Sequence, residues 1–193
     1  MLKYWLNLAK RSLGQPRETL REVLDMGFTA PQAIMMLVFL SVVGVLVMNL
    51  ATLLVPAEQQ AVVMSPLSLA AVQLGVVLAT SGALRVGGFM FGGKGDWRDC
   101  VVAMTWLEFL MFLVQLAQIV IILVVPPLTL LVMFAAVAIM FYLLVNFVME
   151  VHGFTNPLSV VAGLIVAMFA IAFVLALLAA MFGVFVVGVD PNV

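Results

Sequence analysis

Charged side chains are scarce in this sequence, and their scarcity decides its class. Only 9% of the 193 residues are charged, while 66% are hydrophobic and the mean hydropathy is +1.32. Soluble domains average about 25% charged and about 45–50% apolar residues, so a water-soluble fold would leave a large apolar surface wet. The composition excludes an ordinary soluble domain and predicts an all-α protein with several membrane-spanning helices.

Cysteine and histidine are almost absent as well. Cys100 is the single cysteine, which excludes an internal disulfide, and no group of Cys, His and carboxylate residues has zinc-site spacing. His152, the single histidine, has no Ser, Cys or Asp at triad spacing and is interpreted as a solvated loop residue. No cofactor, no metal and no nucleic-acid partner are expected, and the chain is not expected to be an enzyme.

A glycine-rich stretch at residues 88–94 has the spacing found at the start of a phosphate-binding loop. Gly95, however, stands where that loop carries Ser or Thr, and an apolar segment takes the place of the strand before it. These glycines are therefore interpreted as a tight turn between two helices, where they permit positive φ values.

Long apolar runs occupy most of the chain after residue 30. A bilayer core of about 30 Å needs roughly 20 apolar residues per helix, and a membrane domain at 31–188 has room for five such helices. The Pro126–Pro127 pair is expected to end the third span, and Asn156 with Pro157 to begin the fifth. The expected spans are 31–55, 67–90, 101–125, 128–149 and 157–187, followed by a tail at 189–193. Small residues at every fourth position of the second span predict a packing face: Ala71, Gly75, Ala79, Ala83 and Gly87.

Residues 1–30 are the one long polar segment and are expected to be amphipathic and to lie at the cytoplasmic interface. A helix over residues 2–13 is predicted to lie in the membrane interface. Its apolar face would hold Leu2, Trp5, Leu6, Leu8, Ala9 and Leu13. Pro16 is placed as the first residue of a second helix. The apolar side of that helix would carry Leu20, Val23 and Leu24.

The basic residues fall on one side of this five-span layout. Five of the eight precede the first span, and the other three, Arg85, Lys94 and Arg98, surround the connection between the second and third spans. By the positive-inside rule this side is the cytoplasm. The amino terminus is therefore expected in the cytoplasm and the carboxyl terminus outside, across the inner membrane if the source is bacterial.

Glu108 is a carboxylate about eight residues into the expected third span. An ionisable group at such a depth is costly and is by default a hint of function. Helical spacing and side-chain reach predict an intramembrane polar network of Glu108 with Arg85, Gln115, Tyr142, Asn146 and Glu150. Two interpretations stay open: a polar path or ligand pocket opening to the cytoplasm, in which Glu108 titrates, and a satisfied interhelical network with Arg85 at the interface.

Three segments, in this order and within this layout, resemble the Yip family of membrane proteins, named for interaction with Ypt and Rab GTPases. They are Pro-Arg-Glu-Thr-Leu at 16–20, Phe-Gly-Gly-Lys-Gly-Asp-Trp at 91–97 and Phe-Thr-Asn-Pro-Leu at 154–158. The resemblance implies a cytoplasmic amino-terminal region, a five-helix membrane domain and, in eukaryotes, a role in vesicle trafficking. The chain lacks the Asp-Leu-Tyr-Gly-Pro stretch of eukaryotic relatives and has Trp106 where they tend to have Tyr, so it resembles a bacterial-type member and a GTPase partner is not favoured.

Two functional classes follow. The first is a non-enzymatic membrane scaffold or adaptor with a trafficking-like role, whose partners would be membrane lipids, other membrane proteins or further copies of the chain. Its expected cytoplasmic docking loop comprises Gly92, Gly93, Lys94, Asp96, Trp97 and Arg98. The alternative is a small transporter or channel component with a polar path around Glu108.

Overall fold

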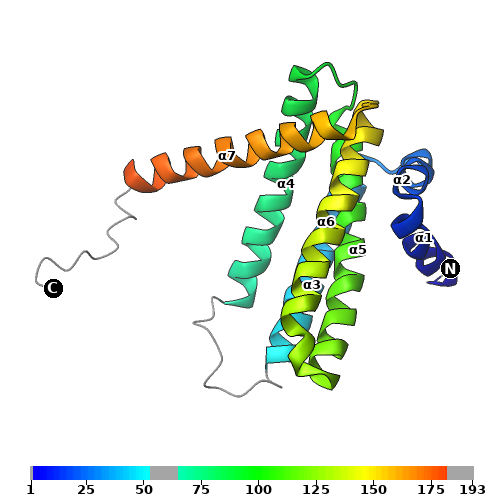
Figure 1. Cartoon of the computed structure of the whole chain (residues 1–193), viewed down its shortest axis with the longest axis vertical. Coiled ribbons are helices and arrows are strands. Elements are labelled where there is room, and N and C mark those ends of the chain that lie inside the picture. The colour runs from blue at the N-terminus through cyan, green and yellow to red at the C-terminus, as the bar shows by residue number, and fades with distance from the viewer. Residues whose placement is uncertain (1, 53–64, 182–193) are drawn as a thin grey trace, which may run out of the picture.

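The computed structural model describes residues 2–52 and 65–181, and every regular element within them is helical (Figure 1). Four helices, α3 to α6, are long and apolar enough to cross a membrane. In chain order the elements are α1 (Leu2–Gly14), α2 (Pro16–Asp25), α3 (Ala30–Thr52), α4 (Pro66–Met90), α5 (Trp97–Val124), a 3₁₀ turn (Pro126–Leu128), α6 (Thr129–His152) and α7 (Pro157–Met181).

Local capping explains where the helices begin and end. Asp96 starts α5 four residues earlier than expected, because its Oδ1 accepts a hydrogen bond from the Asp99 amide at 2.8 Å. Asn156 Oδ1 accepts from the Leu158 amide at 2.9 Å, which confirms the expected start of α7. The double proline ends α5 as predicted. The connection between α3 and α4, the end of the expected fifth span and the tail at 189–193 lie outside the described residues.

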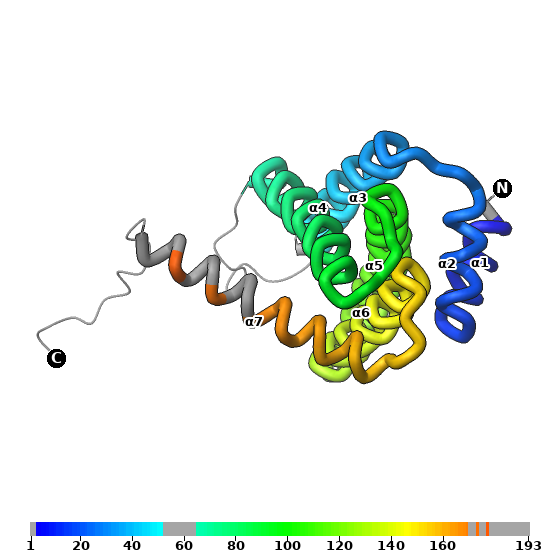
Figure 2. Tube along the Cα trace, turned by 90° about the horizontal axis from the view of Figure 1, so that it is seen from above, coloured from blue at the N-terminus to red at the C-terminus, as the bar shows by residue number. Residues whose placement is uncertain are grey.

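The four long helices form a bundle with α5 at its centre. α5 contacts α3, α4, α6 and also α2, while α1 and α2 lie together along one side (Figure 2). The α4–α5 and α6–α7 connections meet at one end, which is called here the α4–α5 end (Figure 1). From that end α7 runs across the bundle axis, past α4, instead of along it. The segment expected as a fifth span is therefore an apolar helix that is not aligned with the other four.

The core lies at the α4–α5 end of the bundle. Every α5 residue from Cys100 to Leu107 is buried, because α1 and α2 add to the enclosure made by the bundle helices. With 28 residues, α5 is about 42 Å long and exceeds the about 30 Å apolar core of a bilayer by about 12 Å. The excess length lets the first turns of α5, which are enclosed by protein, lie outside the apolar core of the bilayer.

The small-residue row of α4 does not form the predicted packing face. Ala71, Gly75 and Ala79 are exposed, and a Cβ added at Gly75 would meet no atom of another helix within 4 Å. The buried face of α4 lies on the opposite side of the helix from the middle of that row, and there Gly88 packs against His152 of α6. Its buried residues are Ala70, Val77, Ser81 and Gly88.

Candidate functional site

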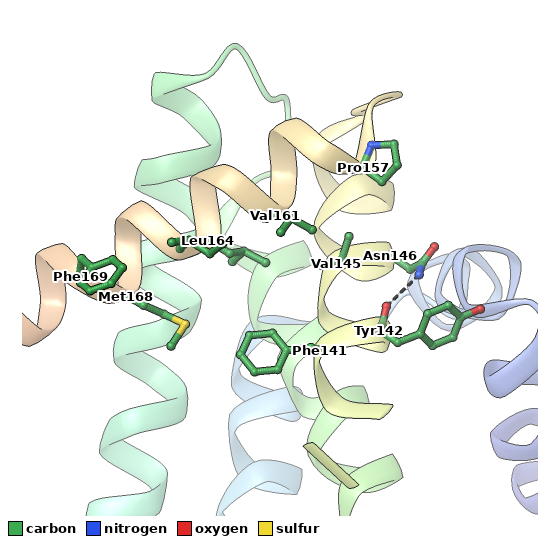
Figure 3. A pocket seen from close by; sticks show the side chains of 10 residues that line it. Phe141, Tyr142, Val145, Asn146, Pro157, Val161, Leu164, Met168 and Phe169 are labelled. Atoms are coloured by element: carbon green, nitrogen blue, oxygen red, sulfur yellow. Dashed lines mark hydrogen bonds between the residues drawn. The ribbon is translucent and has the colours of Figure 1, made fainter. Parts of the chain in front are cut away.

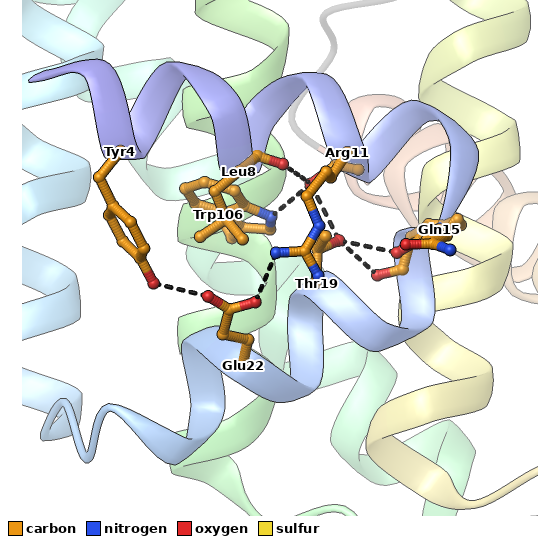
Figure 4. Close-up of polar contacts among 9 residues, drawn as sticks. Tyr4, Leu8, Arg11, Gln15, Thr19, Glu22 and Trp106 are labelled. Atoms are coloured by element: carbon orange, nitrogen blue, oxygen red, sulfur yellow. Dashed lines mark hydrogen bonds and ion pairs between the residues drawn. The ribbon is translucent and has the colours of Figure 1, made fainter.

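The helices α1 and α2 form a hairpin (residues 2–25) that is tied to α5 through a buried polar chain. Trp106 Nε1 donates to Ser12 Oγ at 3.3 Å, and Ser12 Oγ lies 3.0 Å from Thr19 Oγ1 (Figure 4). Thr19 Oγ1 in turn donates to backbone carbonyls at the start of α2. Both hydroxyl residues are fully buried yet hydrogen-bonded, so they fix the hairpin without an unsatisfied polar group.

Only some of the apolar residues predicted to form the faces of the two hairpin helices are buried. Leu20 and Val23 of α2 are buried, as the sequence indicated. On α1, Leu8 is buried, but Leu6 and Leu13 are 46% and 50% exposed, which corrects the single apolar face predicted there. The reason is that α1 turns Leu8 and Ser12 toward α2 and α5, and this rotation leaves the flank of the apolar arc uncovered.

Glu150, near the end of α6, holds the hairpin against the bundle. Arg17 Nε lies 3.2 Å from Glu150 Oε2, and Arg21 Nε donates to Oε1 at 2.7 Å. The carboxylate side chain is only 7% exposed, whereas the two arginines remain partly in solvent. A nearly buried carboxylate bound by two cations strongly restrains the position of α2 on α6.

The intramembrane carboxylate Glu108 pairs with a neighbouring helix. Its Oε2 accepts a hydrogen bond from Gln73 Nε2 on α4 at 3.1 Å. Gln115, expected on the same face, turns to α3 and donates to the Gly44 carbonyl at 3.0 Å. Sequence reasoning missed Gln73, although it is the sole side-chain amide of the second span and could have been found on that ground.

The remaining residues of the predicted network do not join Glu108. Asn146 Nδ2 donates to the Tyr142 carbonyl of its own helix at 2.8 Å, and Tyr142 is 45% exposed. Arg85 is exposed and forms no ion pair with any carboxylate in residues 2–52 and 65–181. The expected reach of Arg85 to Glu108 or Glu150 is therefore corrected, because Glu150 is already bound by the arginines of α2.

Tyr142 and Asn146 line an otherwise apolar groove between α6 and α7, with a volume of about 850 Å³ (Figure 3). The other lining residues are Phe141, Val145, Pro157, Val161, Leu164, Ile165, Met168 and Phe169. The groove exists because α7 leaves the bundle axis directly after Pro157 and crosses above this part of α6.

His152 lies in a pocket built from glycines at the α4–α5 end. Its side chain is 2% exposed, and Nδ1 accepts a hydrogen bond from the Gly95 amide at 3.2 Å. A Cβ added at Gly88 would overlap the imidazole ring, and one at Gly93 would lie 2.6 Å from Nδ1. Glycine is therefore required at these positions so that the backbone can approach the ring.

The interpretation of His152 as a solvated loop residue is wrong. The ring stacks on Phe154 with centroids 5.5 Å apart, and its Nε2 lies 3.9 Å from Cys100 Sγ. Of the glycines read as a turn, Gly92 fits that reading, with φ of +81°. The close approach of these glycines to His152 could not be predicted from sequence spacing, because the ring belongs to a helix more than fifty residues further along the chain.

The docking loop is only partly available at the surface. Lys94 and Asp96 are exposed, but Trp97 packs against the core. The Lys94 amide also donates to the His152 carbonyl at 3.3 Å, so the backbone of the loop is fixed to the end of α6. The exposed part of the predicted loop is thus a short, backbone-restrained segment.

Arg98 joins the docking loop to the connection between α2 and α3. Its Nη2 donates to the Leu24 carbonyl at 2.8 Å and its Nε to the Phe28 carbonyl at 2.7 Å. These carbonyls lie at and just after the end of α2, and the Leu24 carbonyl also accepts from the Gly27 amide at 3.2 Å. The guanidinium therefore holds the end of α2 beside the start of α5.

We expect Arg98→Met to destabilise the protein by about 1–2 kcal/mol, because two charge-assisted hydrogen bonds to backbone carbonyls are lost at a partly exposed site. The thermal unfolding midpoint of the detergent-solubilised protein measures this loss. Lys94→Met is the matched control, since Lys94 is exposed and its side chain makes no such bonds. Equal shifts in the two variants would contradict the assigned role.

A second contact set links the exposed sides of α1 and α2. Tyr4 Oη donates to Glu22 Oε1 at 2.7 Å, and Arg11 Nη1 lies 3.0 Å from Oε2 (Figure 4). The bond from Tyr4, helped by the charge of Arg11, holds the pKa of Glu22 below its usual value. The same bond raises the pKa of Tyr4. The contribution of Glu22 to stability is then present above the pKa of the unfolded carboxyl and is lost as the pH falls through the folded pKa.

We expect Tyr4→Phe to return the pKa of Glu22 toward its usual value and to flatten the acid side of the stability profile. The change is small because both side chains are in contact with solvent. Titration of ¹³C-labelled glutamate carboxyls in the solubilised protein checks this, with Tyr142→Phe as the control. An unchanged Glu22 titration would show that Tyr4 does not donate to it in solution.

One protein family matches most of the chain. The family model described as the Yip1 domain covers residues 10–181, which include the end of α1, all of α2 to α6 and the described part of α7. Neither a curated protein nor a solved structure matches the chain. Among the described residues, no group of three or more Cys, His, Asp or Glu side chains could hold a metal ion.

Proposed function

The chain belongs to the Yip1 domain family, and from this premise we propose that it is a non-enzymatic membrane scaffold or adaptor that holds partners at its cytoplasmic end. The observation that carries the proposal is the binding of Glu150 by Arg17 and Arg21. It keeps a helical hairpin rigid beside the exposed residues of the docking loop, and a restrained surface is what an adaptor needs. The partners are other membrane proteins or further copies of the chain, and a GTPase is not required.

The proposed topology has five spans: α7 turns away from the crosswise orientation seen in Figure 1 and crosses the membrane as the fifth. Support comes from α7 itself: its 25 residues contain no charge, and its exposed side chains are large and apolar, as at Val166, Phe169 and Phe173. A helix that is apolar on all sides is stable in lipid and not in water. The amino terminus and the docking loop then lie in the cytoplasm, and in a bacterium the membrane is the inner one.

Reporter fusions test this topology. A reporter that is active only outside the cytoplasm is expected to be active after residue 193 and inactive when it is placed before residue 2. Activity at both positions, or at neither, would remove the fifth span from the proposal.

Photo-cross-linking in native membranes tests the scaffold. A cross-linking residue at Glu18, which is exposed on α2, is expected to capture a discrete protein partner. Capture should fall when Arg17 and Arg21 are both changed to Gln, since the hairpin is then released. A cross-linking residue at Phe134, which is 67% exposed in the second turn of α6, is the control and should capture lipid.

A transport assay tests the alternative, a small transporter or channel component. Vesicles that contain the purified protein are expected to show no solute or ion flux above empty vesicles. Flux that Glu108→Gln abolishes, with normal expression of the variant, would replace the scaffold by a transporter or channel component.

A further inference from the structure

The helix α1 carries an exposed stripe that the hairpin leaves unused. Lys3, Leu6, Lys10 and Leu13 are spaced by three and four residues and all are exposed, so they form one row, called here the outer stripe. α1 contains no acidic residue along its whole length. A row of two half-exposed leucines and two lysines, without a carboxylate among them, combines the apolar and cationic side chains that helices in a membrane interface carry.

The outer stripe points away from α2 and toward the far end of the bundle. Tyr4 and Arg11 reach from α1 to Glu22 on α2, and helical geometry puts the outer stripe on the other side of α1 (Figure 4). In Figure 1, α1 lies below α2, on the side away from the α4–α5 and α6–α7 connections. The side of α1 that carries the stripe is therefore the one nearest to the spanning part of the bundle.

The depth of α1 matches the edge of the membrane. The Trp5 ring lies 6.0 Å from that of Trp106, which stacks on Phe109 at 5.2 Å. Trp106 comes about 14 Å along α5 from its first residue, close to the about 12 Å by which α5 exceeds the apolar core. Aromatic side chains of this kind gather where lipid headgroups meet the apolar core.

We propose that the outer stripe of α1 binds anionic phospholipid headgroups in the leaflet that faces the hairpin. Leu6 and Leu13 enter the boundary of the acyl chains, while Lys3 and Lys10 extend to the phosphates. The contact is selective for anionic lipid because both cations are exposed and no carboxylate of α1 neutralises them. This inference deepens the proposed function and rests on it for the cytoplasmic side of the contact.

Spin labelling of the full chain in vesicles tests the position of the stripe. A nitroxide attached at Leu13→Cys is expected to be more accessible to oxygen than to a water-soluble nickel chelate, and one at Glu18→Cys the reverse. The native Cys100 is 1% exposed and remains unlabelled. Equal accessibility of the two labels to the nickel chelate would overturn the proposal. So would a label at residue 13 that is protected from the chelate only when native membrane proteins are present, because a protein and not lipid would then cover the stripe.

Tryptophan quenching tests the selectivity. Brominated phosphatidylglycerol in phosphatidylcholine vesicles is expected to quench about twofold more than brominated phosphatidylcholine at the same fraction. The ratio should fall to one in the double variant Lys3→Gln, Lys10→Gln and should persist in the control Arg85→Gln, Lys94→Gln. A ratio that stays high in the first variant would overturn the assignment to the stripe. A reporter that is active before residue 2 would instead refute the cytoplasmic placement, and loss of Glu18 cross-links would refute the scaffold, while neither result alters the quenching ratio.

Discussion

Gly88→Ala is expected to disrupt the α4–α5 end of the bundle, whereas Gly87→Ala one residue earlier is expected to be tolerated. A Cβ at Gly88 overlaps the buried His152 ring, and one at Gly87 meets no heavy atom within 4 Å. Overpacking of a rigid ring against backbone costs about 1–3 kcal/mol, and the upper part of this range applies because the buried ring is also closely approached by Gly93 and Gly95. Alanine at position 87 can even stabilise the helix by up to about 1 kcal/mol.

Thermal unfolding of the solubilised variants measures the difference, and a double-mutant cycle identifies its cause. In a His152→Ala background the ring is gone, so Gly88→Ala should cost much less than in the wild type. Equal costs in the two backgrounds would show that the glycine is required for another reason.

The double variant Arg17→Ala, Arg21→Ala is expected to detach the hairpin from the bundle. It leaves the Glu150 side chain, 7% exposed in the folded protein, without either cation. Breaking a buried pair from one side costs about 3–5 kcal/mol, and we expect about 3 kcal/mol because the arginines themselves are partly solvated. The unfolding midpoint and the rate of proteolysis near residues 14–15, between the two helices, both report the detachment.

Two further variants separate pairing from simple loss of charge. Lys3→Gln with Lys10→Gln removes the same charge from the hairpin without touching Glu150, so it should leave proteolysis nearly unchanged. Adding Glu150→Gln to the double arginine variant should recover part of the stability, since a neutral amide is less costly to bury than an unpaired carboxylate. If the triple variant is no more stable than the double, the buried charge is not the cause.

The sequence predicted helix boundaries and the buried side of α2 better than it predicted partners. The proline at the start of α2, the double proline after α5 and the buried Leu20 and Val23 follow from local rules and are confirmed. The bond between Arg17 and Glu150 spans 133 residues, and no period within α2 or α6 encodes it. Side-chain reach from the end of the second span had suggested Arg85 as a partner of either Glu108 or Glu150, whereas Glu150 is paired with Arg17 and Arg21.

The hydrophobic pattern of the sequence also left undetermined how each helix is rotated about its own axis, and so which of its sides faces the rest of the protein. An apolar arc on α1 wide enough to include Leu6 and Leu13 does not say which part of it meets protein and which part meets another environment. In α4 a row of small residues was the strongest pattern, yet the close contact forms at Gly88, which lies outside that row. Which side of a helix is buried depends on the positions of side chains from other helices, and these positions are set by the tertiary structure.

The ion pairs of Glu150 also set an order of events during synthesis. Arg21 leaves the ribosome 129 residues before its partner, which at about 5–20 residues per second is a delay of roughly 6–26 s. Until α5 has been made, which takes most of that interval, Leu8 and Leu20 have neither α5 nor α6 to cover them, and an amphipathic hairpin in this state has the membrane surface as its available apolar neighbour. The amino-terminal hairpin therefore reaches its final position only after most of the chain has been made, and the first helices to be synthesised are among the last to be fixed.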